Sequence, residues 1–107
     1  MGRFLVLWRQ NPMAPWPTDP SEGLKMNEMM MMAIDDLMKK GEIEEFGFFP
    51  DGTSGYGISK GEITDAYRRV SMFQPYITVE VHEIIPFKKG WEISREVMKA
   101  QIEARKK

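Results

Sequence analysis

The residues best suited to chemistry in this sequence lie close together near residue 80. Thr78, Glu80 and His82 alternate with apolar residues over 77–85, the pattern of a strand with one polar face. A carboxylate and an imidazole two residues apart on one strand face are suited to proton transfer, with Glu80 as general base and His82 as its partner. The alternative is that the pair faces solvent or forms a structural polar cluster.

Other side chains are candidates for the walls of a binding site beside that pair. Tyr76 and Thr78 would position a substrate through their hydroxyl groups, and Trp8 would contribute an apolar surface. Trp16 lies within a segment that holds four prolines between residues 12 and 20, which can form neither a helix nor a central strand. We expect Trp16 to be either a lid over the pocket or a hydrophobic plug.

The composition excludes several kinds of site. The chain of 107 residues has no cysteine and one histidine, which excludes disulfides, thiolate chemistry and a multi-histidine metal site within one subunit. We therefore expect neither a metal nor a cofactor. Fifteen Lys and Arg against 16 Asp and Glu leave no basic stripe for nucleic acid. No apolar run approaches the roughly 20 residues of a membrane span, and no signal sequence is evident, so we expect a cytoplasmic protein without a membrane partner.

The pattern along the chain predicts a single α+β domain over residues 1–107. Asp19-Pro20 begins a helix, Gly41 ends it, and Asp51-Gly52 marks a hairpin. The predicted strands are 4–8, 42–49, 55–59 and 76–85, and the predicted helices are 20–40, 62–73 and 91–106. The order β-α-β-β-α-β plus a C-terminal helix is that of the ferredoxin-like fold. Right-handed crossovers place both crossover helices on one face of an antiparallel sheet.

The first strand predicts that the domain is not monomeric, because it is apolar on both faces. Phe4, Val6 and Trp8 lie on one face, and Leu5 and Leu7 lie on the other. A face that exposes a Phe, a Val and a Trp is a patch that monomers avoid. We therefore expect a homodimer or higher homo-oligomer in which a second copy covers that face, sheet against sheet. The alternative is that the proline-rich segment or the last helix folds back over it.

The helices add to this expectation. The last helix carries two apolar stripes, whereas a surface helix needs only one. One stripe holds Ile93, Val97, Ala100 and Ala104, and the other holds Trp91, Met98 and Ile102. Met32 falls on the water side of helix 20–40 and is a candidate contact between subunits. In helix 62–73 we expect Asp65, Arg68 and Arg69 to form a solvated ion-pair face.

The segment Phe73-Gln74-Pro75-Tyr76-Ile77-Thr78-Val79-Glu80-Val81 resembles the segment that enters the last strand of muconolactone isomerases. There, a Phe and a Pro-Tyr pair lead into an alternating strand that carries Glu-Val. The rest of the chain lines up more loosely. The resemblance implies the dimeric α+β barrel superfamily, whose members include cofactor-free isomerases, small monooxygenases and YCII-related proteins. YCII-related proteins carry an early histidine, and here none precedes His82.

Together, the residues and the resemblance imply a homo-oligomer that binds a small organic molecule. The first hypothesis is a cofactor-independent isomerase, similar to muconolactone isomerase, that acts by proton transfer on a small cyclic or aromatic organic acid. The alternatives are a non-catalytic ligand-binding or assembly module, and a cofactor-free or haem-binding monooxygenase-like protein that uses His82. An enzyme needs a cavity that reaches Glu80, whereas an assembly module can have this space filled.

Overall fold

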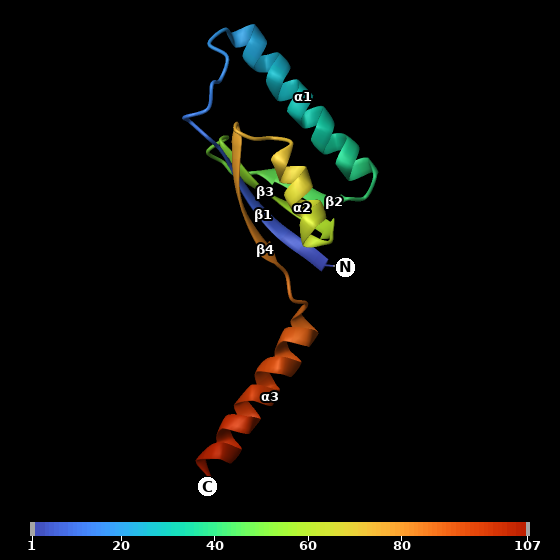
Figure 1. The fold of residues 1–107 in the computed structure, drawn as a ribbon, viewed down its shortest axis with the longest axis vertical. Coiled ribbons are helices and arrows are strands. Elements are labelled where there is room, and N and C mark those ends of the chain that lie inside the picture. Colours follow the sequence, from blue (N-terminus) through green and yellow to red (C-terminus); the bar gives the residue numbers. More distant parts are fainter. Residues whose placement is uncertain (1, 107) are drawn as a thin grey trace.

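The computed structural model describes residues 2–106 and contains one four-stranded sheet with two helices against one face and a third helix extending away from it (Figure 1). The elements are β1 (Gly2–Gln10), α1 (Pro20–Lys39), β2 (Ile43–Phe48), β3 (Ser54–Gly61), α2 (Ile63–Ser71), β4 (Ile77–Glu83) and α3 (Phe87–Arg105).

The sheet has the strand order β2-β3-β1-β4, and every neighbouring pair is antiparallel. The predicted α+β ferredoxin-like fold with a C-terminal helix is therefore confirmed. Most elements begin and end within a few residues of their predicted bounds. The exception is α3, which begins at Phe87 rather than Trp91 because Pro86 takes the N-cap position and Lys88-Lys89-Gly90 continues the helix.

Helix α1 begins and ends at the residues that the sequence indicates. The Asp19 carboxylate accepts a hydrogen bond from the backbone N–H of Glu22 at 3.3 Å, and Pro20 stands at the first helical position. After the helix, Gly41 takes a φ of 77°, which a residue with a Cβ atom rarely adopts. The turn at Gly41 leads the chain into β2, which begins at Ile43.

Strand β1 turns the opposite face toward the helices from the one that the sequence suggested. Phe4 and Trp8 are only 3% and 8% exposed, and they are covered by the helices of their own chain. The prediction that Phe4, Val6 or Trp8 meets a second copy is therefore wrong. The reason is the register of β1 with β4, which sets Trp8 opposite Val79, and residues opposite each other point to the same face.

We call the other side of the sheet the open face, because within residues 2–106 neither α1 nor α2 covers it (Figure 1). Its centre is apolar and partly buried, and its rim is polar. The centre consists of Leu5, Leu7, Tyr56 and Ile58, and the rim includes Arg9, Glu45, Lys60, Thr78, Glu80 and His82. The Tyr56 hydroxyl donates a hydrogen bond to the Glu45 carboxylate, and this bond raises the pKa of Tyr56.

Helix α3 continues away from the sheet, so that the molecule is 70 Å long but only 29 and 24 Å across (Figure 1). None of its residues is buried. The exposed residues include large apolar side chains, namely Phe87, Trp91, Ile93, Val97, Met98 and Ile102. Most of the stability of a helix in a protein comes from packing its apolar face, so α3 needs a surface against which to pack.

The β2–β3 hairpin is held by Asp51. Its carboxylate accepts hydrogen bonds from the backbone N–H groups of Thr53 and Ser54, at 2.9 and 3.1 Å, and from the Ser54 hydroxyl at 2.9 Å. These bonds, and that from the Thr53 N–H above all, hold the pKa of Asp51 below its ordinary value of 3.8.

We expect Asp51→Ala to lower the melting temperature near neutral pH, and the difference from the unchanged protein to disappear in acid. The folded-state pKa of Asp51 is lowered, so its stabilisation is complete above the unfolded-state pKa and is lost as the pH falls through the folded-state pKa. Thermal unfolding of both proteins from about pH 7 to about pH 2 measures this. A difference in melting temperature that stays constant over this range would contradict the role of the carboxylate.

Candidate functional site

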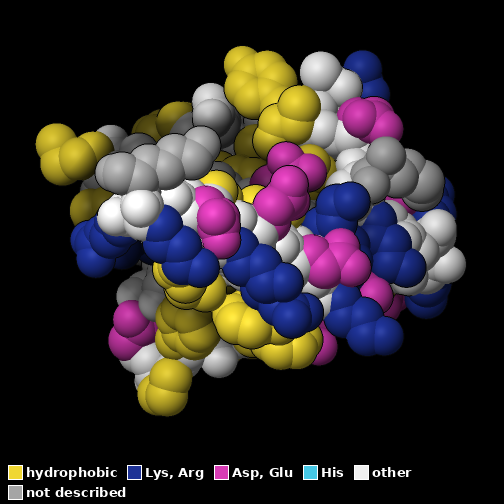
Figure 2. Space-filling model, turned by 90° about the horizontal axis from the view of Figure 1, so that it is seen from below, with side chains coloured by type: hydrophobic (Ala, Val, Ile, Leu, Met, Phe, Trp, Pro, Cys, Tyr) yellow, Lys and Arg dark blue, Asp and Glu magenta, His cyan; other side chains and the backbone are white. Residues whose placement is uncertain are grey.

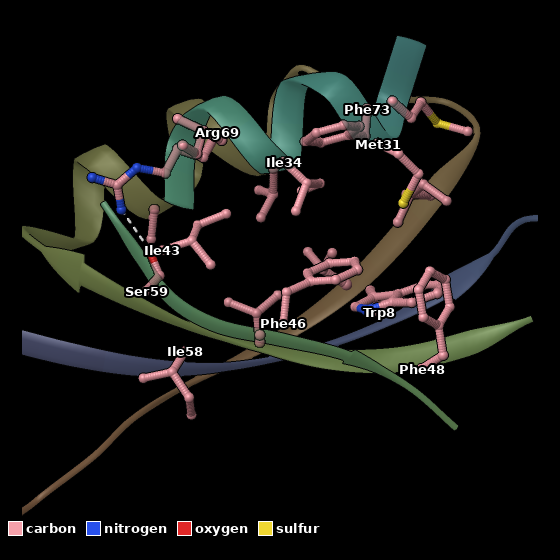
Figure 3. Close-up of a pocket in the computed structure, with 18 of the residues that line it drawn as sticks. Trp8, Met31, Ile34, Ile43, Phe46, Phe48, Ile58, Ser59, Arg69 and Phe73 are labelled. Atoms are coloured by element: carbon pink, nitrogen blue, oxygen red, sulfur yellow. Dashed lines mark hydrogen bonds between the residues drawn. The ribbon is translucent and has the colours of Figure 1, made fainter. Parts of the chain in front are cut away.

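A cavity of about 110 Å³ lies between the two crossover helices and the sheet (Figure 3). Its lining is almost entirely apolar. Met31 and Ile34 enter it from α1, Phe46 and Trp8 from the sheet, and Phe73 from the chain that follows α2. Ile58 points away from it, toward the open face (Figure 3). A concave apolar space with few polar groups is typical of small-molecule sites.

The floor of the cavity is formed by a cluster of aromatic rings. The rings of Trp8 and Phe46 are stacked, with centroids 5.5 Å apart and planes 5° from parallel, and Phe48 meets both rings edge-on. Trp8 lies so close to β3 that a Cβ atom on Gly55 would stand 2.5 Å from Trp8 Cζ2. The glycine therefore lets the indole lie flat on the sheet, which gives the cavity a flat aromatic wall.

Two buried nitrogen atoms beside this cavity have no hydrogen-bond partner within the described part of the chain. They are Nε1 of Trp8 and Nε of Arg69, and both residues line the cavity. A buried donor without a partner costs about 1–3 kcal/mol. Both unsatisfied donors therefore belong to residues that line the cavity.

Arg69 was expected on a solvated ion-pair face, and that prediction is wrong. Its side chain is 12% exposed, its guanidinium donates to the Ser59 hydroxyl and to the Lys60 carbonyl oxygen at 2.8 Å, and it pairs with Glu42 at 3.2 Å. The helical spacing carries the signal that was missed, because Arg69 lies three residues after the buried Ala66 and therefore on the same face of α2.

By contrast, the neighbouring pair behaves as expected. Arg68 and Asp65 form an ion pair at 3.5 Å in which the arginine side chain is 79% exposed. It lies on the outer surface of α2 and contributes nothing to the cavity.

The site residues predicted from the sequence do not all meet in one place. Trp8 lines the cavity under the helices, whereas Thr78, Glu80 and His82 lie on the open face, on the opposite side of the sheet. Glu80 Oε2 and His82 Nε2 are 3.0 Å apart and hydrogen-bonded. In the single chain their side chains are 66% and 56% exposed, so the enclosure of this pair by a second copy stays a prediction.

Glu80 also borders a hollow on the open face. Thr78, Leu7, Arg9 and Phe49 line the same hollow. The Thr78 hydroxyl donates a long hydrogen bond of 3.4 Å to the Arg9 carbonyl oxygen, so it is held by the neighbouring strand. The acid and the hydroxyl group predicted to act together therefore do face the same space.

Trp16 and Tyr76 meet at the end of the sheet where β4 begins. Their rings pack edge to face with centroids 5.0 Å apart, and Trp16 Nε1 donates to the Asn11 carbonyl oxygen at 2.6 Å. The Asn11 side chain in turn donates to the Pro75 carbonyl oxygen at 2.9 Å. These contacts fix the proline-rich segment against the chain that leads into β4.

Within residues 2–106, no three acidic or imidazole side chains gather where they could hold a metal ion. No helix in the same range has the length and the apolar character needed to cross a membrane. A search of protein-family models found no family that matches the chain, and a search of curated proteins found no matching relative. The one specific motif of the resemblance to muconolactone isomerases therefore remains residues 73–81.

Proposed function

We propose that the protein is a small-molecule-binding homo-oligomer whose ligand occupies the cavity between the helices and the sheet. The ligand is a flat, mainly apolar organic molecule with one hydrogen-bond acceptor. The observation that carries this proposal is the unpaired, buried N–H of Trp8 in a wall of stacked aromatic rings. An acceptor on the ligand that approaches Nε1 in the plane of the indole removes the cost of that orphaned donor, and the rest of a flat ligand packs against the surrounding aromatic and apolar side chains.

The charge at the far end of the cavity favours a neutral ligand. Arg69 is already neutralised by Glu42, at 3.2 Å. A carboxylate taken into this apolar space would lose its hydration without gaining a free cation, which costs several kcal/mol. An organic acid, as the resemblance implies, would bind here only if Glu42 released Arg69, so a ring nitrogen or a carbonyl oxygen is the better acceptor.

A matched pair of ligands tests this proposal. Quinoline and naphthalene have nearly the same size and shape, but only quinoline has a ring-nitrogen acceptor. We expect quinoline to bind more tightly, with the hydrogen bond to Trp8 contributing about 1 kcal/mol, or roughly a fivefold difference in Kd. In Trp8→Phe, which keeps an aromatic ring and removes the donor, this preference should disappear. Calorimetric titration of the unchanged protein and of Trp8→Phe with each ligand measures the four Kd values.

Two results would contradict the ligand proposal. If neither compound binds, the cavity is not a ligand site. If both bind equally well to the unchanged protein, the cavity takes flat apolar molecules but Trp8 does not select an acceptor.

A second candidate function is proton transfer at Glu80 and His82, as in a cofactor-independent isomerase built as a dimeric α+β barrel. The 3.0 Å hydrogen bond between the two side chains favours it, because the pair is within the distance needed for general-base catalysis. The hollow beside Glu80 and Thr78 would receive a small cyclic ketone or acid.

We expect the protein to exchange the α-hydrogens of a small cyclic ketone for deuterium, followed by NMR in heavy water. Glu80→Gln should abolish this exchange and leave the melting temperature unchanged, because the Glu80 side chain is 66% exposed. Glu83→Gln is the matched control, since it removes an exposed acid from the same strand. Exchange at the same rate in the Glu80 variant would rule this pair out as the catalytic base.

A further inference from the structure

Helix α3 presents more apolar surface than a helix on the outside of a protein carries. At about 100° per residue, all of its charged residues except Arg105 fall within about a third of its circumference. The remaining two thirds are apolar, small or uncharged, with Ser94 near the middle. Viewed from the end of the molecule where α3 lies, hydrophobic side chains appear on both sides of a charged band (Figure 2).

The open face of the sheet is the second apolar surface without a partner in the described chain. Leu5 and Leu7 on the central strand β1, with Tyr56 and Ile58 on β3, form its apolar centre. Helix α3 does not cover this centre in its own chain, because it leaves β4 and runs on beyond the end of the sheet (Figure 1). Pro86 at its N-cap stiffens the connection.

We infer that α3 of one copy packs across the open face of a second copy, and that the second copy returns the same contact. This inference rests on the homo-oligomeric part of the proposed function and names the surfaces that form it. A reciprocal exchange about a two-fold axis covers the apolar centre of the open face and a large part of the apolar arc of α3 in both chains. It replaces the sheet-to-sheet contact that the sequence suggested.

The two surfaces agree in length and in area. A helix of 19 residues is about 28 Å long, and a strand of nine residues, such as β1, is about 31 Å long. Phe87 is 84% exposed and Trp91 is 51% exposed, which together leave roughly 300 Å² of aromatic surface in water on each chain. With the other apolar residues of α3 and both copies, the exchange reaches the order of 1,200–2,000 Å² of a stable interface.

Their charges agree as well. Basic residues flank the uncharged arc of α3 on both sides, with Arg95 and Lys88 on one side and Lys89 on the other. Acidic residues lie beside the apolar centre of the open face on both edge strands, with Glu45 on β2 and Glu80 on β4, whereas the basic Arg9 and Lys60 lie toward the two ends of the inner strands β1 and β3. A helix that lies along the sheet therefore sets basic flanks against acidic edges.

The exchange also completes the second candidate site. Glu80 and His82 are exposed in the single chain, and the partner's α3 would lie over the hollow that Glu80 borders. Covering the hollow excludes water, which strengthens electrostatic interactions inside it. The site would then consist of residues from two chains.

Crosslinking between two distinguishable chains tests the exchange, because the natural sequence has no cysteine. One chain carries Ser94→Cys in the middle of the uncharged arc of α3, and a co-expressed chain with a different tag carries Leu7→Cys on the open face. A bismaleimide reagent should join the two different chains in most of the mixed dimers. Glu96→Cys on the charged side of α3 is the matched control and should give no link to Leu7→Cys.

Any other crosslinking result contradicts the exchange, and each result points to a different arrangement of the chains. Links between two Ser94→Cys chains show that the helices pair with each other, and links between two Leu7→Cys chains show that the open faces pack together. A dimer mass with no link between the two different chains rejects the exchange but keeps the homo-oligomer. A monomer mass for the unchanged protein rejects both.

Discussion

Gly55→Ala should destabilise the protein by about 3 kcal/mol, because there is no room for a Cβ atom at this position. The added carbon would stand 2.1 Å from the carbonyl oxygen of Gly47 and 2.5 Å from Cζ2 of Trp8. The first of these is a backbone atom of the neighbouring strand, so it moves only if the pairing of β2 with β3 is disturbed. The Cζ2 atom of Trp8 can move away only if the indole leaves its stacked position against Phe46.

Gly57→Ala is the matched control for this substitution. Gly57 lies two residues further along the same strand and on the same face, and its added Cβ would meet its nearest neighbours at 3.6 Å, an ordinary contact distance. We expect it to be neutral, or stabilising by up to about 1 kcal/mol, because alanine has less conformational freedom to lose on folding. Chemical unfolding of both variants measures their free energies of unfolding. Equal losses of stability in Gly55→Ala and Gly57→Ala would mean that Trp8 is not held against Gly55.

Val97→Glu combined with Met98→Glu should convert the proposed homo-oligomer into a monomer. The two residues come from the two apolar stripes of α3 and are 50% and 46% exposed in the single chain. Charges at these positions would be buried without partners in any complex that covers α3, at a cost of several kcal/mol. Light scattering at micromolar concentration should fall from a multiple of 12.5 kDa to 12.5 kDa.

The control for this experiment lies on the charged side of the same helix. Glu92→Gln combined with Glu96→Gln changes two residues that the exchange leaves in water, so the mass should remain that of the homo-oligomer. The far-UV circular dichroism of Val97→Glu/Met98→Glu should also lose helical signal, since a detached α3 loses the packing that gives a helix most of its stability. If Val97→Glu/Met98→Glu keeps the mass of the unchanged protein, α3 lies outside the interface.

Local signals in the sequence were sufficient to predict the elements and their order. Asp19, Pro20 and Gly41 define the ends of α1 through capping geometry, which involves only neighbouring residues. The alternation of β4 placed Thr78, Glu80 and His82 on one face, because the side-chain period of a strand is two. Right-handed crossovers then place both crossover helices on one face of the sheet.

The features that the sequence did not reveal depend on contacts between distant segments. Both faces of β1 are apolar, so only its register with β4 decides that Trp8, rather than Leu7, lies under the helices. Arg69 is withdrawn from water by Glu42, 27 residues away in the chain. The cavity depends on the distance at which α1 and α2 stand above the sheet, which no local pattern expresses.

The indole N–H resonances of the protein provide the most direct test of the central claim, that a small flat acceptor binds beside Trp8. The chain has three tryptophans, so two of these resonances serve as internal controls. Trp16 already donates to the Asn11 carbonyl oxygen, and Trp91 lies on α3, which carries no part of the cavity. On titration with quinoline in a ¹⁵N–¹H correlation spectrum, we predict that the Trp8 signal moves downfield, as a newly hydrogen-bonded N–H does, while naphthalene causes no such shift. An unchanged Trp8 signal at saturating quinoline, or a shift confined to Trp16 or Trp91, would contradict the proposed site.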